Sequence, residues 1–161
     1  MREPHANTDD EPDRRLIRLQ SWITEDVLWR THGDIAGMQD DVDPRYTMRK
    51  LLEEAIAAHC AALERTHHGG RPWPPADHLA RGGVNARDRR AGDIALLQSD
   101  VARPLRRRCY GTVNGIKATI DRSYTLRTHL ESALNQHLAR LEAAHRRRWP
   151  PRRDLPRGRR P

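Results

Sequence analysis

Side chains that can bond to the edges of nucleic-acid bases stand at alternate positions in two short apolar segments of the chain. Arg18 and Gln20 lie in the first segment, and Gln98 lies in the second. An arginine can bond to guanine O6 and N7, and a glutamine can bond to adenine N6 and N7. In a two-stranded ribbon, alternate side chains point outward from one face, so these three residues are predicted to contact bases in a DNA major groove. Leu96 and Asp100 stand at outward positions of the second segment, which predicts asymmetric recognition.

Predicted phosphate contacts come from two helix starts and from a run of arginines. Free backbone N–H groups and the positive end of the helix dipole favour an anion at a helix N-terminus. The predicted set is Thr47, Arg49, Lys50, Thr125, Arg127, Arg106, Arg107 and Arg108. Residues 81–161 contain 20 Lys and Arg against 7 Asp and Glu, a net charge of +13, whereas residues 1–80 carry −5. The C-terminal half is therefore predicted to attract a polyanion, and double-stranded DNA is the predicted partner.

Enzyme chemistry is not expected, because the chain contains no P-loop, nucleophile elbow, zinc-protease helix or paired-cysteine motif. His59 and His137 share one helix stripe, but their spacing supplies too few ligands for a zinc site, and no metal or other cofactor is predicted. Cys60 is expected to be a small buried apolar residue. The longest uncharged apolar run, 55–63, is too short to cross a membrane, so a cytoplasmic, nucleoid- or plasmid-associated protein is expected.

The elements that would carry these side chains are predicted from a match of the chain with itself at an offset of 78 residues. Segments 16–23 and 94–101 alternate in the manner of strands. A first helix is predicted from about Thr24, and a second helix of about 20 residues from Thr47, with an equivalent helix from Thr125. Trp22 is expected to cover the end of the ribbon.

The predicted fold is mainly α with a small β-ribbon. One strand with two helices exposes a ribbon edge and two apolar stripes, so each copy requires a partner. We expect strand 16–23 to pair antiparallel with strand 94–101, giving a tandem of two β-α-α repeats that forms a pseudo-dimer. Closure within one chain and exchange between two chains are both open. The predicted segments are an acidic disordered tail over 1–13, repeats over 14–68 and 93–145, a Gly/Pro/Arg linker over 69–92 and a basic disordered tail over 146–161.

This arrangement resembles the ribbon-helix-helix DNA-binding fold, through LIRLQSWITEDVLWR in the first copy and IALLQSDVARPLRRR in the second. The segments YTMRKLLEEAIAAHCAALERTHHGGRPWPP and YTLRTHLESALNQHLARLEAAHRRRWPP are similar to the C-terminal domain of plasmid centromere-binding ParB proteins of actinobacterial type. The resemblance covers nearly all of residues 14–161. It implies centromere binding in plasmid partition, further self-association on repeated sites, and contact with a ParA-type ATPase through an N-terminal tail, where Arg2 would serve.

Two alternatives remain open at the level of sequence. A transcriptional repressor or an antitoxin would use the same fold to bind DNA. A non-enzymatic interaction module would instead use the acidic first half to bind a protein, with the attraction to DNA incidental.

Overall fold

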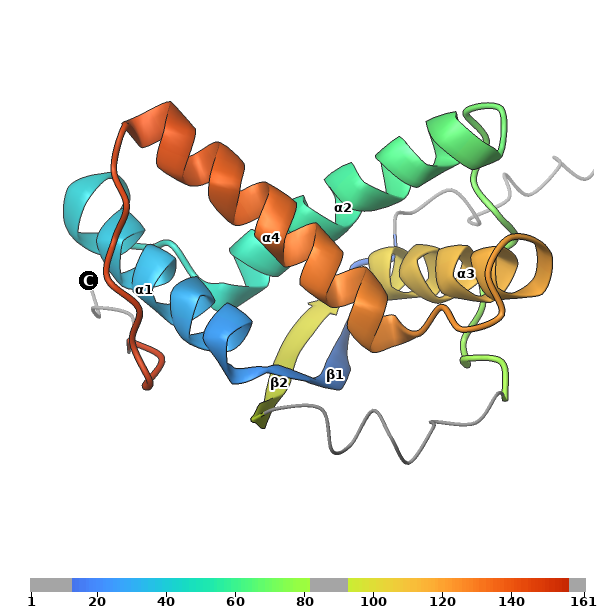
Figure 1. Cartoon of the computed structure of the whole chain (residues 1–161), viewed down its shortest axis with the longest axis horizontal. Coiled ribbons are helices and arrows are strands. Elements are labelled where there is room, and N and C mark those ends of the chain that lie inside the picture. The colour runs from blue at the N-terminus through green and yellow to red at the C-terminus, as the bar shows by residue number, and fades with distance from the viewer. Residues whose placement is uncertain (1–12, 82–92, 157–161) are drawn as a thin grey trace, which may run out of the picture.

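The structure is a computed structural model that describes residues 13–81 and 93–156. Its elements follow in the order strand, helix, helix, strand, helix, helix (Figure 1). Their bounds are β1 Leu16–Thr24, α1 Glu25–Asp41, α2 Met48–His67, β2 Ile94–Ala102, α3 Arg103–Thr119 and α4 Leu126–His145. The prediction of a mainly helical fold with a small two-stranded ribbon is confirmed. In this part of the chain no helix is both long and apolar enough for a membrane span.

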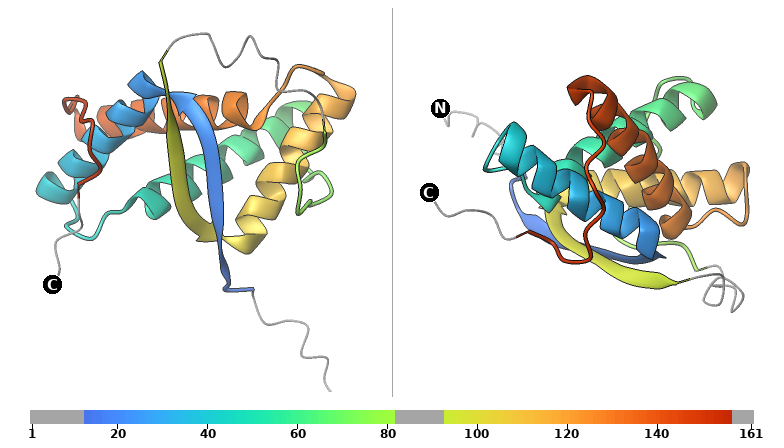
Figure 2. Two further views of the ribbon diagram at one scale, coloured as in Figure 1. Left: turned by 90° about the horizontal axis from the view of Figure 1, so that it is seen from below. Right: turned by 60° about the vertical axis from the view of Figure 1, so that its left-hand side comes forward.

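β1 and β2 form an antiparallel ribbon whose register places Gln20 opposite Gln98. The ribbon lies on one side of the helices and is seen face on in the left panel of Figure 2. Leu19 and Ile23 of β1 are fully buried, and Leu97 and Val101 of β2 are at most 1% exposed. The inward and outward faces therefore follow the predicted alternation, because apolar side chains occur at every second position.

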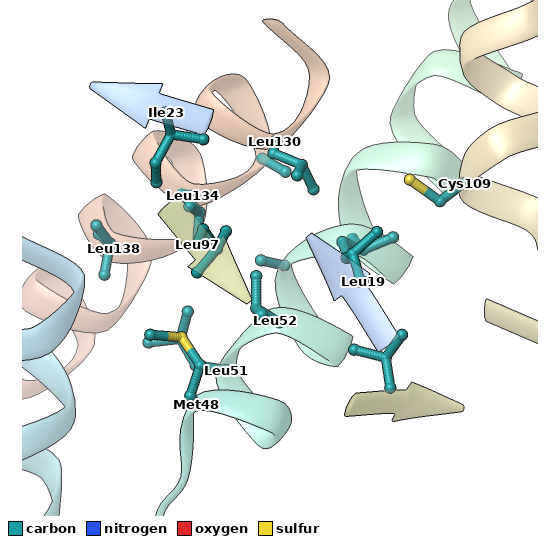
Figure 3. Packing of buried hydrophobic residues seen from close by; sticks show 14 of the residues in the cluster. Leu19, Ile23, Met48, Leu51, Leu52, Leu97, Cys109, Leu130, Leu134 and Leu138 are labelled. Carbon is teal, nitrogen blue, oxygen red and sulfur yellow. The ribbon is translucent and has the colours of Figure 1, made fainter. Parts of the chain in front are cut away.

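The helices cover the inner face of the ribbon and pack on one another to form the core (Figure 3). α2 and α4 cross beneath the strands, with α2 against β2 and α4 against β1. Both begin at the predicted N-cap, where the side chain of Thr47 accepts a hydrogen bond from the Lys50 N–H and that of Thr125 accepts one from the Thr128 N–H. These caps satisfy backbone donors that a helix start would otherwise leave unpaired. The buried leucines of α2 and α4 then meet Leu19 and Leu97 from the ribbon (Figure 3).

Two Trp-Pro-Pro segments lie outside the regular elements and are nevertheless packed. The sequence predicts a linker from residue 69 and a disordered tail from residue 146, but Trp73 is 6% exposed and Trp149 is 8% exposed. A Cβ atom on Gly115 of α3 would lie 2.2 Å from the Trp73 ring, and one on Gly37 of α1 would lie 2.2 Å from the Trp149 ring. Glycine is therefore needed at both positions. Each segment contributes a single large apolar side chain, which is why no periodic pattern indicated its packing.

Two partly buried ion pairs also join the halves of the chain. Arg30 of α1 donates to both carboxylate oxygens of Glu142 in α4, at 3.0 and 2.7 Å. Arg108 of α3 bonds to both oxygens of Glu64 in α2, with its Nε 3.0 Å from Oε2. The guanidinium of Arg30 holds the pKa of Glu142 below its usual value. Such bidentate pairs fix the relative placement of the helices that they join.

Candidate nucleic-acid interface

The outer face of the ribbon carries the predicted base-contacting residues. Gln20 and Gln98 form the central cross-strand pair, and both are exposed. Arg18 is also on this face, opposite Asp100. The structure therefore brings all three predicted base-contacting residues onto one surface of the ribbon. Their amide and guanidinium groups can present donors and acceptors to base edges.

Arg18 is exposed but already engaged with its neighbours across the ribbon. Its Nε lies 3.5 Å from Asp100 Oδ1, and its Nη1 donates to Gln98 Oε1 at 3.4 Å. The side chains of Arg18 and Asp100 are 61% and 53% exposed. An ion pair as exposed as this one is weak, so the guanidinium can exchange it for a partner on a ligand.

The start of α2 gathers positive charge around a shallow cavity of about 330 Å³. Arg49 lies 3.3 Å from Glu53, and Lys50 lies 3.5 Å from Asp43, with both cationic side chains 51% exposed. Arg45 also lines the cavity, and so do the carboxylates of Glu53 and Glu54. Arg45 was not among the predicted phosphate contacts because it lies in the turn before the helix. Its position two residues before the N-cap Thr47 would have indicated it. The cationic side chains and the helix N-terminus together favour an anion such as a phosphate group.

The start of α4 is more closed than the start of α2. The Nε of Arg127 lies 3.2 Å from Glu131, and its Nη2 donates to Thr24 Oγ1 at 3.3 Å. Thr24 also donates to Glu131, from its backbone N–H at 2.7 Å and its hydroxyl at 2.6 Å. Burial alone would raise the pKa of Glu131, but these hydrogen bonds lower it below its usual value. Arg127 is only 22% exposed, so it offers a phosphate less than Arg49 or Lys50 does.

The arginine run of α3 is partly exposed but engaged by groups from the first half of the chain. Arg106 donates to the carbonyl of Arg18 at 2.8 Å, and Arg107 lies 3.1 Å from Asp77. Arg108 is held by Glu64, as described above. The sequence shows these charges but not the carboxylates from the first half that pack against them. Because Asp77 and Glu64 hold them, Arg107 and Arg108 offer less to a phosphate group than the cations at the start of α2.

Two of the buried histidines, His59 of α2 and His129 of α4, lie against each other, and a third, His137, pairs separately with a carboxylate of α2. The rings of His59 and His129 are 4.8 Å apart, and the Nδ1 of His129 lies 2.7 Å from the hydroxyl of Tyr124. The Nε2 of His137 lies 3.2 Å from Glu54. Burial, together with the nearby His59 ring, lowers the pKa of His129 to about 3, so this ring is neutral at pH 7. No group of three or more metal-ligating side chains is placed to hold an ion in residues 13–81 and 93–156.

Several expectations concern residues outside the described part of the chain. Arg2, predicted to contact an ATPase, lies in residues 1–12, and the end of the basic tail lies in 157–161.

Trp22, expected to cover the ribbon end, is 56% exposed and therefore covers little.

Comparison of the chain with protein-family models, curated proteins and solved structures finds no match.

Proposed function

We propose that the chain is a ribbon-helix-helix pseudo-dimer within one polypeptide and that it binds double-stranded DNA in a sequence-specific manner. The observation that carries this proposal is the register of the ribbon. It sets two exposed glutamines, Gln20 and Gln98, opposite each other at the centre of the outer face. The tandem arrangement is supported by the same offset of 78 residues between these glutamines and between the strands that carry them.

The shape of the ribbon suits the major groove of B-form DNA. That groove admits a two-stranded ribbon, whose outward side chains then face the base edges. The inner face of the ribbon is anchored by Leu19, Ile23 and Leu97 in the core, so the strands have rigid support. A rigid support reduces the entropy that is lost when the reading side chains meet DNA.

Phosphate contacts are proposed at the helix starts, with most of the strength at α2. Arg45, Arg49 and Lys50 surround the cavity there, and Arg49 and Lys50 remain half exposed. Thr47, Thr125 and Arg127 add backbone N–H groups and one further charge. We expect Arg49→Gln to weaken binding to all sequences alike and to reduce the salt dependence of log K by about one unit.

Selection from a random duplex library with the purified full chain tests the proposal. We expect one sequence family to be enriched, and we expect the double variant Gln20→Ala with Gln98→Ala to lose the preference while keeping weak nonspecific binding. Gln136→Ala is the matched control, because Gln136 is exposed on α4 and should leave the selected sequence unchanged. Enrichment of the same family by the double variant would refute base reading by the ribbon.

The proposed cellular role is plasmid partition, and it rests on the resemblance of the second-helix segments to centromere-binding proteins. Footprinting on the DNA that flanks the gene of this protein is the appropriate test. Several protected repeats would support partition, and recruitment of a ParA-type ATPase to those repeats would extend it. A single protected operator over a promoter would instead support a repressor or an antitoxin.

A further inference from the structure

The cross-strand pairs on the two sides of the ribbon's centre differ in charge and polarity, as the register shows. On one side of the central Gln20 and Gln98, Arg18 lies opposite Asp100. On the other side, Trp22 lies opposite Leu96. The pair next to the centre is therefore charged on one side and apolar on the other, although each strand taken alone contributes one charged and one apolar side chain. Beyond the charged pair, Leu16 lies opposite Ala102 and is 50% exposed.

The charged end matches the two bases of a G·C pair. A guanidinium donates to guanine O6 and N7, and a carboxylate accepts from the N4 amine of cytosine. Arg18 and Asp100 present these two groups side by side, with 3.5 Å between Nε and Oδ1. A carboxylate on a DNA-facing surface is repelled by phosphates, so Asp100 gains most where it can accept from a cytosine amine.

The apolar end matches thymine. Trp22 is 56% exposed and Leu96 is 38% exposed, so both present apolar surface to the solvent. In the major groove the thymine C5-methyl group is the apolar feature that distinguishes one base pair from another. Contact with that methyl group removes apolar surface of both partners from water.

We propose that the chain recognises a non-palindromic DNA element, with G·C pairs under Arg18 and Asp100 and A·T pairs with thymine methyl groups under Trp22 and Leu96. This inference rests on the proposed DNA binding and adds the class of sequence that is bound. A single chain can have such a preference because its two strands are encoded separately, whereas two identical chains present the same residues to both half-sites.

Selection from a random duplex library tests the inference. The wild-type chain should enrich an element that is rich in G·C at one end and in A·T at the other. Replacing the A·T end by G·C should weaken binding on the order of tenfold. The double variant Trp22→Asp with Leu96→Arg copies the charged pair to the second end, and it should enrich an inverted repeat with G·C at both ends.

The folding control is straightforward, because Arg18, Trp22, Leu96 and Asp100 are all exposed on the ribbon's outer face. Each variant should keep the far-UV circular dichroism and thermal midpoint of the wild type. A wild-type element that is itself an inverted repeat would overturn the inference and leave the proposed DNA binding intact. Enrichment of no sequence would overturn both. An unchanged preference at the A·T end in Trp22→Ala with Leu96→Ala would also overturn the inference.

Discussion

The junction of α1 with α4 and the junction of α3 with α2 use equivalent positions, 78 residues apart, but differ at one buried residue. Both contain a bidentate ion pair, between Arg30 and Glu142 in one and between Arg108 and Glu64 in the other. Beside these pairs, Asp34 and Thr112 are both fully buried.

The two side chains are satisfied very differently. The Thr112 hydroxyl donates to the carbonyl of Arg108 at 2.9 Å, whereas neither carboxylate oxygen of Asp34 accepts a hydrogen bond. Only the protonated Asp34 carboxyl can form one, by donating to the carboxylate of Glu142. Burial, and next the negative charge of Glu142, raise the pKa of Asp34 to about 7, although the charges of Arg30 and Arg148 oppose this rise. At this position a threonine hydroxyl is buried with its hydrogen bond satisfied. A carboxyl at the same position lowers the free energy of unfolding by an amount that depends on pH.

The largest expected effect comes from the tryptophans that cover both junctions. Trp149→Ala and Trp73→Ala should each lower the free energy of unfolding by about 3–5 kcal/mol, because each removes a buried indole and leaves a cavity. Trp149→Ala should cost more, since Trp149 Nε1 also donates to Asp41 at 2.9 Å. Urea unfolding measures both values. Trp22→Ala is the control, with an expected change within about 0.5 kcal/mol because this indole is exposed. A loss as small as that of the control would show that the two segments are not packed in solution.

Exchanging the two buried side chains tests the comparison directly. At pH 8, Asp34→Thr should raise the free energy of unfolding by about 1–3 kcal/mol, because it removes an unpaired buried carboxylate. Thr112→Asp should lower it by about 3 kcal/mol, since it buries a second carboxylate beside Glu64. Chemical denaturation at pH 8 measures both changes.

The pH dependence of this exchange has a definite sign. The Asp34 carboxyl binds its proton more tightly in the folded chain, where its pKa is about 7, than in the unfolded chain, where it is 3.8. The stability that this proton provides is complete below pH 3.8 and is lost as the pH rises toward 7. The gain from Asp34→Thr should therefore grow between pH 4 and pH 7. A gain of equal size across that range would contradict the assignment of a raised pKa to Asp34.

The halves also differ at the equivalent positions 51 and 129. The first half has a buried leucine, Leu51, and the second half has a buried histidine, His129. The pKa of His129 is about 3 in the folded chain against 6.5 ordinarily. The unfolded chain therefore gains protons first, and stability is lost as the pH falls from 6.5 toward 3. At pH 4.5 this loss is roughly 2–3 kcal/mol.

The variant His129→Leu should accordingly lose less stability than the wild type between pH 7.5 and pH 4.5. Its absolute stability is best compared after adding Tyr124→Phe, because the Tyr124 hydroxyl contacts His129. Urea midpoints at the two pH values give the slope. His67→Gln is the control, because His67 is exposed, and it should leave the pH dependence of stability unchanged. Equal slopes for wild type and His129→Leu would show that His129 is not the acid-sensitive group.

The smallest expected effect is at the ends of the two strands. The Thr24 hydroxyl bonds to Glu131 at 2.6 Å, whereas the equivalent residue of β2 is Ala102. Thr24→Ala should cost about 1 kcal/mol, and Ala102→Thr should not destabilise the chain, because Glu53 stands at the position equivalent to Glu131. Thermal midpoints measured side by side would resolve this difference. An unchanged midpoint in Thr24→Ala would show that the bond from Thr24 contributes nothing to stability.

The strands, the caps and the inward face of the ribbon were predictable, because Leu19, Ile23 and their equivalents alternate with polar residues and because Thr47 and Thr125 each precede an apolar stripe. The packed tryptophans were not predictable, since each is accepted by a glycine in the other half. For the interface, the three base-contacting residues follow from alternation alone. The role of Arg107 and Arg108 depends on Asp77 and Glu64, whose approach is set by tertiary packing and leaves no local signal.

The exchange of tryptophans between halves has a consequence for synthesis on the ribosome. Trp149, which packs against Gly37 of α1, is synthesised 112 residues after it. The packing of α1 therefore cannot be completed until Trp149 has been made. At about 5–20 residues per second the delay is roughly 6–22 s. During that interval the nascent first half exposes the apolar surface of β1, α1 and α2, so newly made chains are expected to depend more on chaperones when translation is slower.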